Sequence, residues 1–306
     1  MNIKSPITQS NNTAFEKSIS VEWIIEKYKK NLHIDVSKFF AGLKKIEIYK
    51  CLDTGYRFYH PFCISGDGKF YEDLEKLPWY YPDWKWEHSI AESLIKHSDK
   101  ILEIGCAYGN FLEKMHKNGF ECAGLELNES AVKDGIKKGL KILNQSIQNH
   151  SKENNEKYDI VCSFQVAEHI ADIQKFLEDS ISALKHNGKL IISVPNNDSL
   201  LFKCNDDLML NYPPHHMGLW DINSLISLQK YFNLQIEGIY IEPLQSYHFG
   251  FAKAETERKF IKQTKNKYGI IYSLLKPLSK KFIDLNAVAL TKYIIGHTIM
   301  AVYVKK

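Results

Sequence analysis

Apolar and polar residues follow a regular pattern from about residue 83 to the last residues of the chain. Short, nearly continuous apolar runs are separated by segments whose apolar positions recur at helical spacing. The runs predict strands at 101–105, 121–127, 140–146, 158–164, 188–195, 234–243 and 297–304, and the other segments predict helices at 84–97, 110–117, 129–138, 172–185 and 221–231. Alternating strands and helices, with strands apolar on both faces, indicate an α/β fold whose mostly parallel sheet is covered by helices on both sides.

The residues before this region follow a different pattern. Residues 1 to about 17 are polar and predict a mobile tail. Ser20 then precedes apolar positions at helical spacing, so we expect a capped helix over 21–32. Residues 46–82 are rich in Tyr, Phe, Trp and turn residues, with short strand-like pieces. We therefore divide the chain into an N-terminal segment, 1–82, and a larger domain, 83–306.

Composition narrows the class of protein. The 306 residues are 44% hydrophobic and 25% charged with a net charge of +4, which is typical of a soluble globular protein and gives no reason to expect nucleic-acid binding. Neither a signal peptide nor an apolar run of membrane-spanning length is present, so we expect a cytoplasmic protein without stable membrane insertion. The six scattered cysteines predict free thiols in a reducing compartment.

The most informative feature is a small-residue turn between the first strand and helix of the large domain. The stretch 101–110 reads ILEIGCAYGN, and 121–127 reads ECAGLEL. Gly105 and Glu126 lie 21 positions apart, about the spacing that puts a glycine turn under a nucleoside and a carboxylate against its ribose. The dinucleotide fingerprint needs a third glycine where Asn110 stands, which disfavours an NAD-dependent oxidoreductase. The alternatives are a plain tight turn and a solvated acid.

Together with FQVAEHI (164–170) and LKHNGKLIISVPN (184–196), these residues resemble the class I S-adenosylmethionine-dependent methyltransferases of bacteria. The resemblance implies a Rossmann-like sheet of seven strands with the last strand antiparallel, and S-adenosylmethionine as the cofactor. It places Glu126 at the ribose, Glu103 toward the amino-acid end, and residues 146–147 near the adenine, where many relatives have an acid. The implied cofactor-binding residues are Glu103, Gly105, Cys106, Ala107, Gly109, Glu126, Leu127, Ser146, Ile147, Phe164 and Gln165.

A stiff loop, NYPPHHMGLW at 211–220, should lie over the carboxyl ends of the strands, where open α/β sheets bind ligands. An activated methyl group needs alignment and a group that takes the proton of the acceptor. His215 or His216 is our first choice for that base, and His169 at the end of the fourth strand is the second. The alternative is that these histidines are structural. The pair could reach Asp198 and Asp206, but no metal-ligand spacing is met, so we expect no metal.

Two N-terminal features and one insertion have competing interpretations. The stretch 51–63 resembles a zinc knuckle, but Thr54 stands in place of the second thiolate, so we expect a degenerate, metal-free knuckle. The aromatic run 79–86, WYYPDWKW, either lines the substrate mouth or packs between the two parts. A basic helical insertion at about 245–295 offers peripheral contact with an anionic membrane or a phosphate-bearing substrate, or is a solvated face.

The resemblance fixes the reaction type better than the acceptor. We expect methyl transfer to a small molecule, with O-methylation of a sugar or nucleotide-linked sugar, in glycan or secondary-metabolite synthesis, as the working hypothesis. An amine, a phenol or a quinone precursor is the alternative acceptor. A catalytically silent protein that only binds the cofactor or a partner is the alternative of another class.

Overall fold

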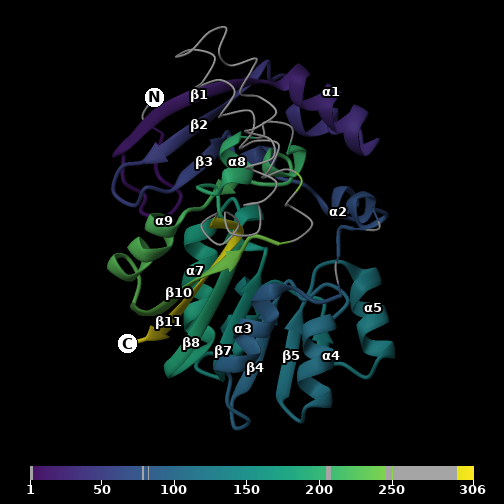
Figure 1. Ribbon diagram of the computed structural model, residues 1–306, viewed down its shortest axis with the longest axis vertical. Helices are drawn as coiled ribbons and strands as arrows, with labels where there is room; N and C mark the ends of the chain where they lie inside the picture. Colours follow the sequence, from purple (N-terminus) through teal and green to yellow (C-terminus); the bar gives the residue numbers. More distant parts are fainter. Residues whose placement is uncertain (1–2, 78, 82, 205–207, 246–249, 251–294) are drawn as a thin grey trace, which may run out of the picture.

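The computed structural model describes residues 3–77, 79–81, 83–204, 208–245, 250 and 295–306. Two sheets organise these residues, a large one of seven strands and a small antiparallel one of four. Figure 1 shows the large sheet in the lower part of the view and the small sheet, which contains the first strands of the chain, above it. The predicted basic insertion at 245–295 falls almost entirely outside the described residues.

The large sheet has the strand order β10-β11-β8-β7-β4-β5-β6. Neighbouring strands from β8 to β6 run parallel, and β11 runs antiparallel to both β8 and β10. The predicted seven strands and antiparallel last strand are thus confirmed. The strands are β4 (Lys100–Ile104), β5 (Glu121–Leu125), β6 (Ile142–Leu143), β7 (Tyr158–Phe164), β8 (Leu184–Pro195), β10 (Leu234–Pro243) and β11 (Ile295–Lys305).

Helices cover both faces of this sheet, as the apolar strands require. Successive residues of β4 point to opposite sides: Ile101 packs in a cluster with Phe111 of α4, and Leu102 in a cluster with Phe176 of α7. The five predicted helices are confirmed, most with shorter bounds, whereas α6 and α8 were not predicted. The helices are α3 (Trp86–Leu94), α4 (Asn110–Lys117), α5 (Glu129–Lys137), α6 (Ile147–Glu153), α7 (Ile173–Ala183), α8 (Leu200–Cys204) and α9 (Ile222–Ser227).

The predicted mobile tail over residues 1–17 is wrong, because Ser5 and Ile7 are buried and Ile7 packs in the main hydrophobic core. Thr13–Ser20 forms strand β1, which pairs antiparallel with β2 (Lys45–Cys51), and β3 (Arg57–His60) follows in the small sheet. The helix after it is confirmed as α1 (Val21–Leu32), where the Ser20 hydroxyl accepts a hydrogen bond from the amide of Trp23 at 3.3 Å. Helix α2 (Gly68–Glu75) completes the N-terminal segment.

The loop 211–220 joins the large domain to the small sheet. Its end forms β9 (Gly218–Leu219), which pairs with β3. The hydroxyl of Tyr28 on α1 donates a hydrogen bond to the carbonyl of Tyr212 at 2.9 Å. The N-terminal segment therefore packs on the loop that carries two of the candidate histidines.

The knuckle-like stretch forms a tight turn after β2. The amide of Gly55 donates to the carbonyl of Cys51 at 2.8 Å, and the hydroxyl of buried Thr54 accepts from the amide of Tyr56 at 3.1 Å. The threonine that replaces a thiolate thus closes the turn by its own hydrogen bond. Cys51, Cys63, Cys106, Cys122 and Cys162 are free thiols. Among the described helices, none combines the length and apolar character needed to span a bilayer.

Candidate cofactor cradle and acceptor cavity

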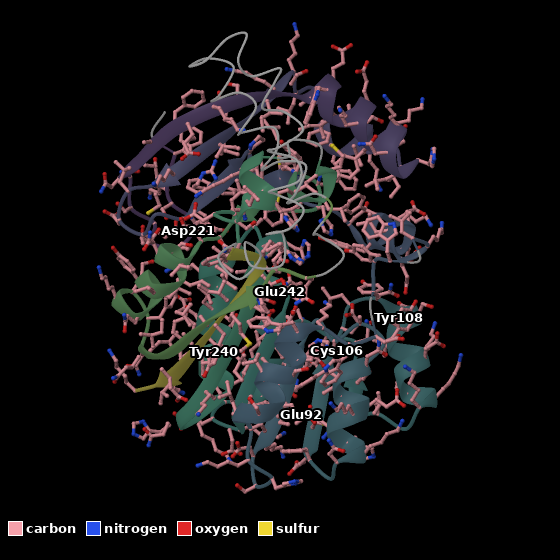
Figure 2. All side chains as sticks on the ribbon, viewed as in Figure 1. Glu92, Cys106, Tyr108, Asp221, Tyr240 and Glu242 are labelled. Carbon is pink, nitrogen blue, oxygen red and sulfur yellow. The ribbon has the colours of Figure 1, made fainter. Side chains whose placement is uncertain are left out.

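The turn after β4 holds its backbone in an unusual conformation. Gly105 and Gly109 have φ values of +70° and +74°, in the left-handed region that favours glycine, and Ala107 also has a positive φ of +46°. A side chain at Gly105 would place its Cβ 2.5 Å from Cγ2 of Val166. The turn ends at Asn110, where α4 begins, so that backbone amides at a helix start face the carboxyl end of the sheet. Figure 2 labels Cys106 and Tyr108 on this turn.

Glu126 ties this turn to the end of β5. Its Oε2 accepts the amide proton of Ala107 at 2.8 Å, and its Oε1 accepts those of Leu127 at 2.7 Å and Asn128 at 2.8 Å. A carboxyl group held by three amide donors is fixed in direction, and its Oε2, which accepts one bond, keeps acceptor capacity. Leu127 beside it is a large apolar side chain that is 69% exposed, which suits a surface for a flat ring.

Glu103 is a buried acid with an incomplete set of partners. Its side chain lies in β4, the residue is 4% exposed, and its Oε2 has no hydrogen-bond partner among the described residues. Burial raises the pKa of this carboxyl well above its usual range, while nearby Lys85 opposes the shift. An unpaired buried acid is costly, and a bound cation would offset that cost. This is what the ammonium of an amino-acid ligand supplies.

One cavity of about 460 Å³ connects these groups with the N-terminal segment. Its size is typical of small-molecule sites. Ten of the eleven predicted cofactor-binding residues lie on its wall: Glu103, Gly105, Cys106, Ala107, Glu126, Leu127, Ser146, Ile147, Phe164 and Gln165. Gly109 does not. A Cβ there would meet Leu140 at 2.6 Å, so this glycine allows close packing beneath the turn.

The structure brings the three candidate histidines together but places only His169 on the cavity wall. His215 and His216, our first choice as bases, are 4% and 5% exposed. Both ring nitrogens of His215 are already bonded, Nδ1 to the carbonyl of Leu210 at 2.8 Å and Nε2 to the hydroxyl of Tyr80 at 2.8 Å. The loop 211–217 is packed under the small sheet rather than spread over the strand ends, which is why these rings do not face the cavity.

A further part of the cavity wall comes from residues to which the sequence assigned no definite role. Tyr71, Tyr80 and Tyr81 line it, together with Lys85 and the segment 65–68. The aromatic run 79–86 had offered a substrate mouth as one of two interpretations, and its tyrosines do reach the cavity. Tyr71 on α2 carried no sequence signal, because its position depends on how α2 packs against the large domain.

The site residues fit S-adenosylmethionine in three independent ways. The glycine turn brings bare backbone to the cavity, Glu126 presents a fixed acceptor for a ribose hydroxyl, and Glu103 offers an unpaired acid for an ammonium. The cavity continues beyond these groups to His169 and the tyrosines, which leaves space for a second molecule.

Comparisons with known proteins agree with this geometry. Residues 82–237, about half of the 306, match the family described as methyltransferase domain. The ubiquinone biosynthesis O-methyltransferase of Rickettsia prowazekii is 33% identical over 101 residues, which cover 32% of this chain and 40% of that protein. The corresponding enzyme of Pelagibacter ubique is 28% identical over 120 residues, 36% of this chain and 50% of that protein. The chain thus spans half or less of the length of these relatives.

Solved structures share the fold. A SAM-dependent methyltransferase from Archaeoglobus fulgidus superposes with a TM-score of 0.51 at 18% identity, over 78% of this chain and 100% of that one. A SAM-dependent methyltransferase from Thermotoga maritima, described as a possible histamine N-methyltransferase, gives 0.50 at 14% identity, over 78% and 98%. With the family match over half of its length and the cofactor cradle in place, this chain belongs to the class I S-adenosylmethionine-dependent methyltransferases.

Proposed function

We propose that this methyltransferase transfers a methyl group to a hydroxyl of a small aromatic molecule. The observation that carries the proposal is the composition of the cavity beyond the cofactor cradle. Tyr71 and Tyr80 line it beside His169 and His215, and the apolar residues Ile170 and Phe176 add to the wall. Such surfaces favour a flat ring, because aromatic pairs gain energy beyond the area they bury.

His169 gives the proposal its chemistry. Its ring lies 5.7 Å from that of Tyr71 between centroids, and its Nδ1 is bonded to the carbonyl of His215 at 2.7 Å. A carbonyl only accepts, so Nδ1 carries the proton and Nε2 keeps a lone pair. S-adenosylmethionine supplies a methyl group already activated on a sulfonium. His169 Nε2 would accept the hydrogen bond of the acceptor hydroxyl and orient its oxygen.

The relatives support an O-methyl acceptor of this kind, since those compared are ubiquinone biosynthesis O-methyltransferases. A sugar or nucleotide-linked sugar, our hypothesis from the sequence, is the second candidate. The lining of the cavity favours it in one respect, because Ser65 and Asp67 add polar groups to it. Tyrosine rings also pack against the apolar face of a sugar ring.

The test is a methyl-transfer assay on the full chain with S-adenosylmethionine and two panels of acceptors, dihydroxybenzenes and nucleotide-linked sugars. We expect turnover with the first panel. Turnover with the nucleotide-linked sugars alone would mean that the acceptor is a sugar and not a phenol. His169→Ala should reduce turnover about a hundredfold, the lower range of acid-base assistance, while S-adenosylhomocysteine affinity stays unchanged. His186→Ala, which removes an exposed histidine, is the matched control.

A further inference from the structure

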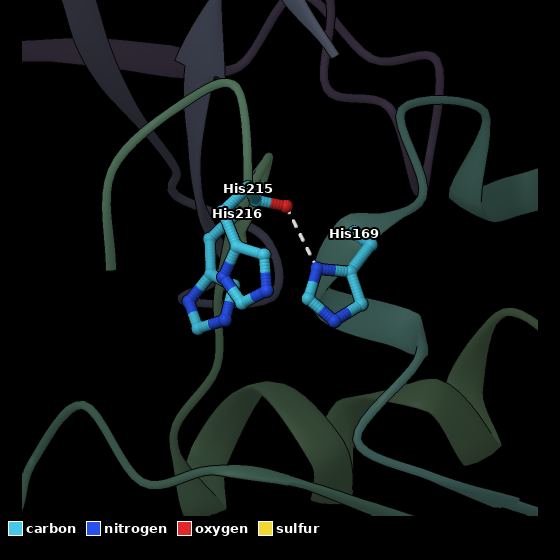
Figure 3. A group of neighbouring side chains, drawn as sticks. All are labelled: His169, His215 and His216. Carbon is cyan, nitrogen blue, oxygen red and sulfur yellow. Dashed lines mark hydrogen bonds between the residues drawn. The ribbon is translucent and has the colours of Figure 1, made fainter. Parts of the chain in front are cut away.

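His169, His215 and His216 form a compact cluster (Figure 3), and His169 lies on the wall of the cavity. The rings of His169 and His215 lie 4.4 Å apart between centroids, and those of His215 and His216 stack at 4.6 Å. One nitrogen from each ring lies within 4.8 Å of the others, the only such group of three or more metal-binding residue types in the described part of the chain. Which atoms the lone pairs of these three imidazoles can bind depends on which nitrogen of each ring carries the proton.

Hydrogen bonds fix the tautomer of all three rings. Nδ1 of His169 faces the carbonyl of His215 at 2.7 Å, and Nδ1 of His215 faces the carbonyl of Leu210 at 2.8 Å. Nδ1 of His216 lies 3.2 Å from the side-chain oxygen of Asn211. Since oxygen accepts in each case, every Nδ1 carries the proton and every Nε2 presents a lone pair.

The orientation of Asn211 is itself held. Its amide nitrogen donates to the side-chain oxygen of Asn197 at 3.0 Å, so its oxygen is the atom directed at His216. Histidines that bind metals almost always donate their other ring nitrogen to a carbonyl or carboxylate oxygen in this way, because the bond fixes the ring and raises its basicity. The cluster therefore has the supporting hydrogen bonds of a metal site.

An unpaired buried acid lies next to the cluster. Glu168 is 1% exposed, its Oε1 lies 3.8 Å from Nε2 of His169, and its Oε2 has no hydrogen-bond partner among the described residues. A ring nitrogen binds a metal through its lone pair, which is what each Nε2 offers. A divalent cation would use the three lone pairs and offset the cost of burying this acid.

We propose that His169, His215 and His216 bind a divalent cation of borderline softness, Zn²⁺ or a similar ion, with an open position toward the acceptor cavity. Three neutral nitrogen ligands and one open position are the arrangement of catalytic zinc sites. The open position faces the cavity because His169 and Tyr80 both line it. The cation's role, though not its binding, rests on the proposed function. It would hold the acceptor oxygen and lower the pKa of its hydroxyl, in place of the hydrogen bond from that hydroxyl to Nε2 of His169, which would then be a ligand.

Binding requires two local rearrangements. Zinc at about 2.0–2.1 Å from each nitrogen holds tetrahedral ligands about 3.4 Å apart, so the rings must close from separations of up to 4.8 Å. The hydroxyl of Tyr80, now 2.8 Å from Nε2 of His215, must yield that lone pair to the cation. Tyr80 lines the cavity, so its hydroxyl would turn toward the cavity to release that lone pair.

The test is a titration of the EDTA-treated full chain with Co²⁺, whose visible absorption reports a tetrahedral nitrogen site. We expect one equivalent to bind, and Zn²⁺ to displace it. His169→Ala and His216→Ala, made separately, should each weaken binding at least tenfold, whereas His186→Ala should leave it unchanged. His169 lies on the cavity wall, so its variant tests the site even if His216→Ala fails to fold.

S-adenosylhomocysteine affinity, measured on the same samples, separates this proposal from the proposed function. No stoichiometric Co²⁺ binding by a protein that binds S-adenosylhomocysteine would overturn the cation site alone. Equally tight Co²⁺ binding by His169→Ala and His186→Ala would overturn it as well. A protein that binds Co²⁺ at the histidines but not S-adenosylhomocysteine would instead refute the methyl-transfer role and leave the cation site standing.

Discussion

Acid should destabilise this protein through His88. Replacing that residue should therefore remove a defined part of the decrease in the free energy of unfolding at low pH. His88 on α3 is 4% exposed and packs among aromatic rings, 5.0 Å from Trp84 and 4.9 Å from Phe164 between centroids. Its Nδ1 accepts the amide proton of Lys85 at 3.3 Å. A proton on that nitrogen would break the bond and put a charge among apolar side chains. Burial, with Lys85 and Lys114 nearby, lowers the pKa of His88 to about 3.

The size of the effect follows from linkage. An unfolded histidine has a pKa of about 6.5, so as the pH falls the unfolded chain binds the proton first, and stability is lost from pH 6.5 downward. At pH 5.5 the unfolded chain gains about 1.4 kcal/mol from this protonation, relative to pH 7.5. This figure depends hardly at all on the folded value while that value stays well below 5, so the result does not rest on a pKa of about 3 in particular.

The variant is His88→Gln, because glutamine at this third helical position can still accept the amide of Lys85. We expect it to be less stable at pH 7.5, since it loses the ring contacts. Between pH 7.5 and 5.5, its free energy of unfolding should fall by about 1.4 kcal/mol less than that of the wild type. Urea unfolding of the ligand-free protein at both pH values measures this. His186→Gln, at an exposed position, should keep the wild-type pH dependence. Equal pH dependence in wild type and His88→Gln, with equal m values, would refute the reasoning.

Glu126→Ala should weaken S-adenosylhomocysteine binding by about 1.5–3 kcal/mol in calorimetry, because it removes charged acceptors and also frees the amide of Ala107, and unchanged affinity would take Glu126 out of the ribose site. Gly105→Ala should lower thermal stability and cofactor affinity together, because its Cβ would lie 2.5 Å from Val166 at a φ of +70°; a fully stable variant with normal affinity would mean that the turn adapts. Cys51→Ser should leave the zinc content of the purified protein unchanged in elemental analysis, because Thr54 stands where a zinc knuckle has its second thiolate. A loss of zinc in this variant would mean that the knuckle-like stretch binds metal after all.

The sequence predicted the large sheet well because each strand is buried on both faces, and burial requires continuous apolar runs. It failed at β1 for the same reason. Residues 13–20 read TAFEKSIS, and most of their side chains are exposed at the edge of the small sheet, so they lack the apolar signal of a strand. The two residues of β9 are also invisible to local patterns, because β3, their partner, lies more than 150 positions earlier.

The cofactor cradle was predictable because its parts lie within one strand-turn-helix-strand unit, where spacing along the chain fixes spacing in space. The histidine cluster was not. His169 follows β7 whereas His215 and His216 lie on a separate loop, and no motif links ligands drawn from two elements at that separation. The hydrogen bond from Tyr80 to His215 joins residues 135 positions apart. Only the packing of the N-terminal segment on the large domain brings such groups together.

This division has a functional consequence. The residues that cradle the cofactor all lie within 82–237, the part of the chain that matches the methyltransferase family. Tyr71, Tyr80 and Tyr81, which also line the cavity, lie before that part, on the N-terminal segment. The family match therefore establishes the cofactor and the reaction but carries no information about the acceptor. Tyr81 packs 5.9 Å from Tyr108 of the cofactor turn between ring centroids, whereas Tyr71 lies beside His169. Replacing Tyr71 should therefore alter the acceptor KM without altering the affinity for S-adenosylhomocysteine.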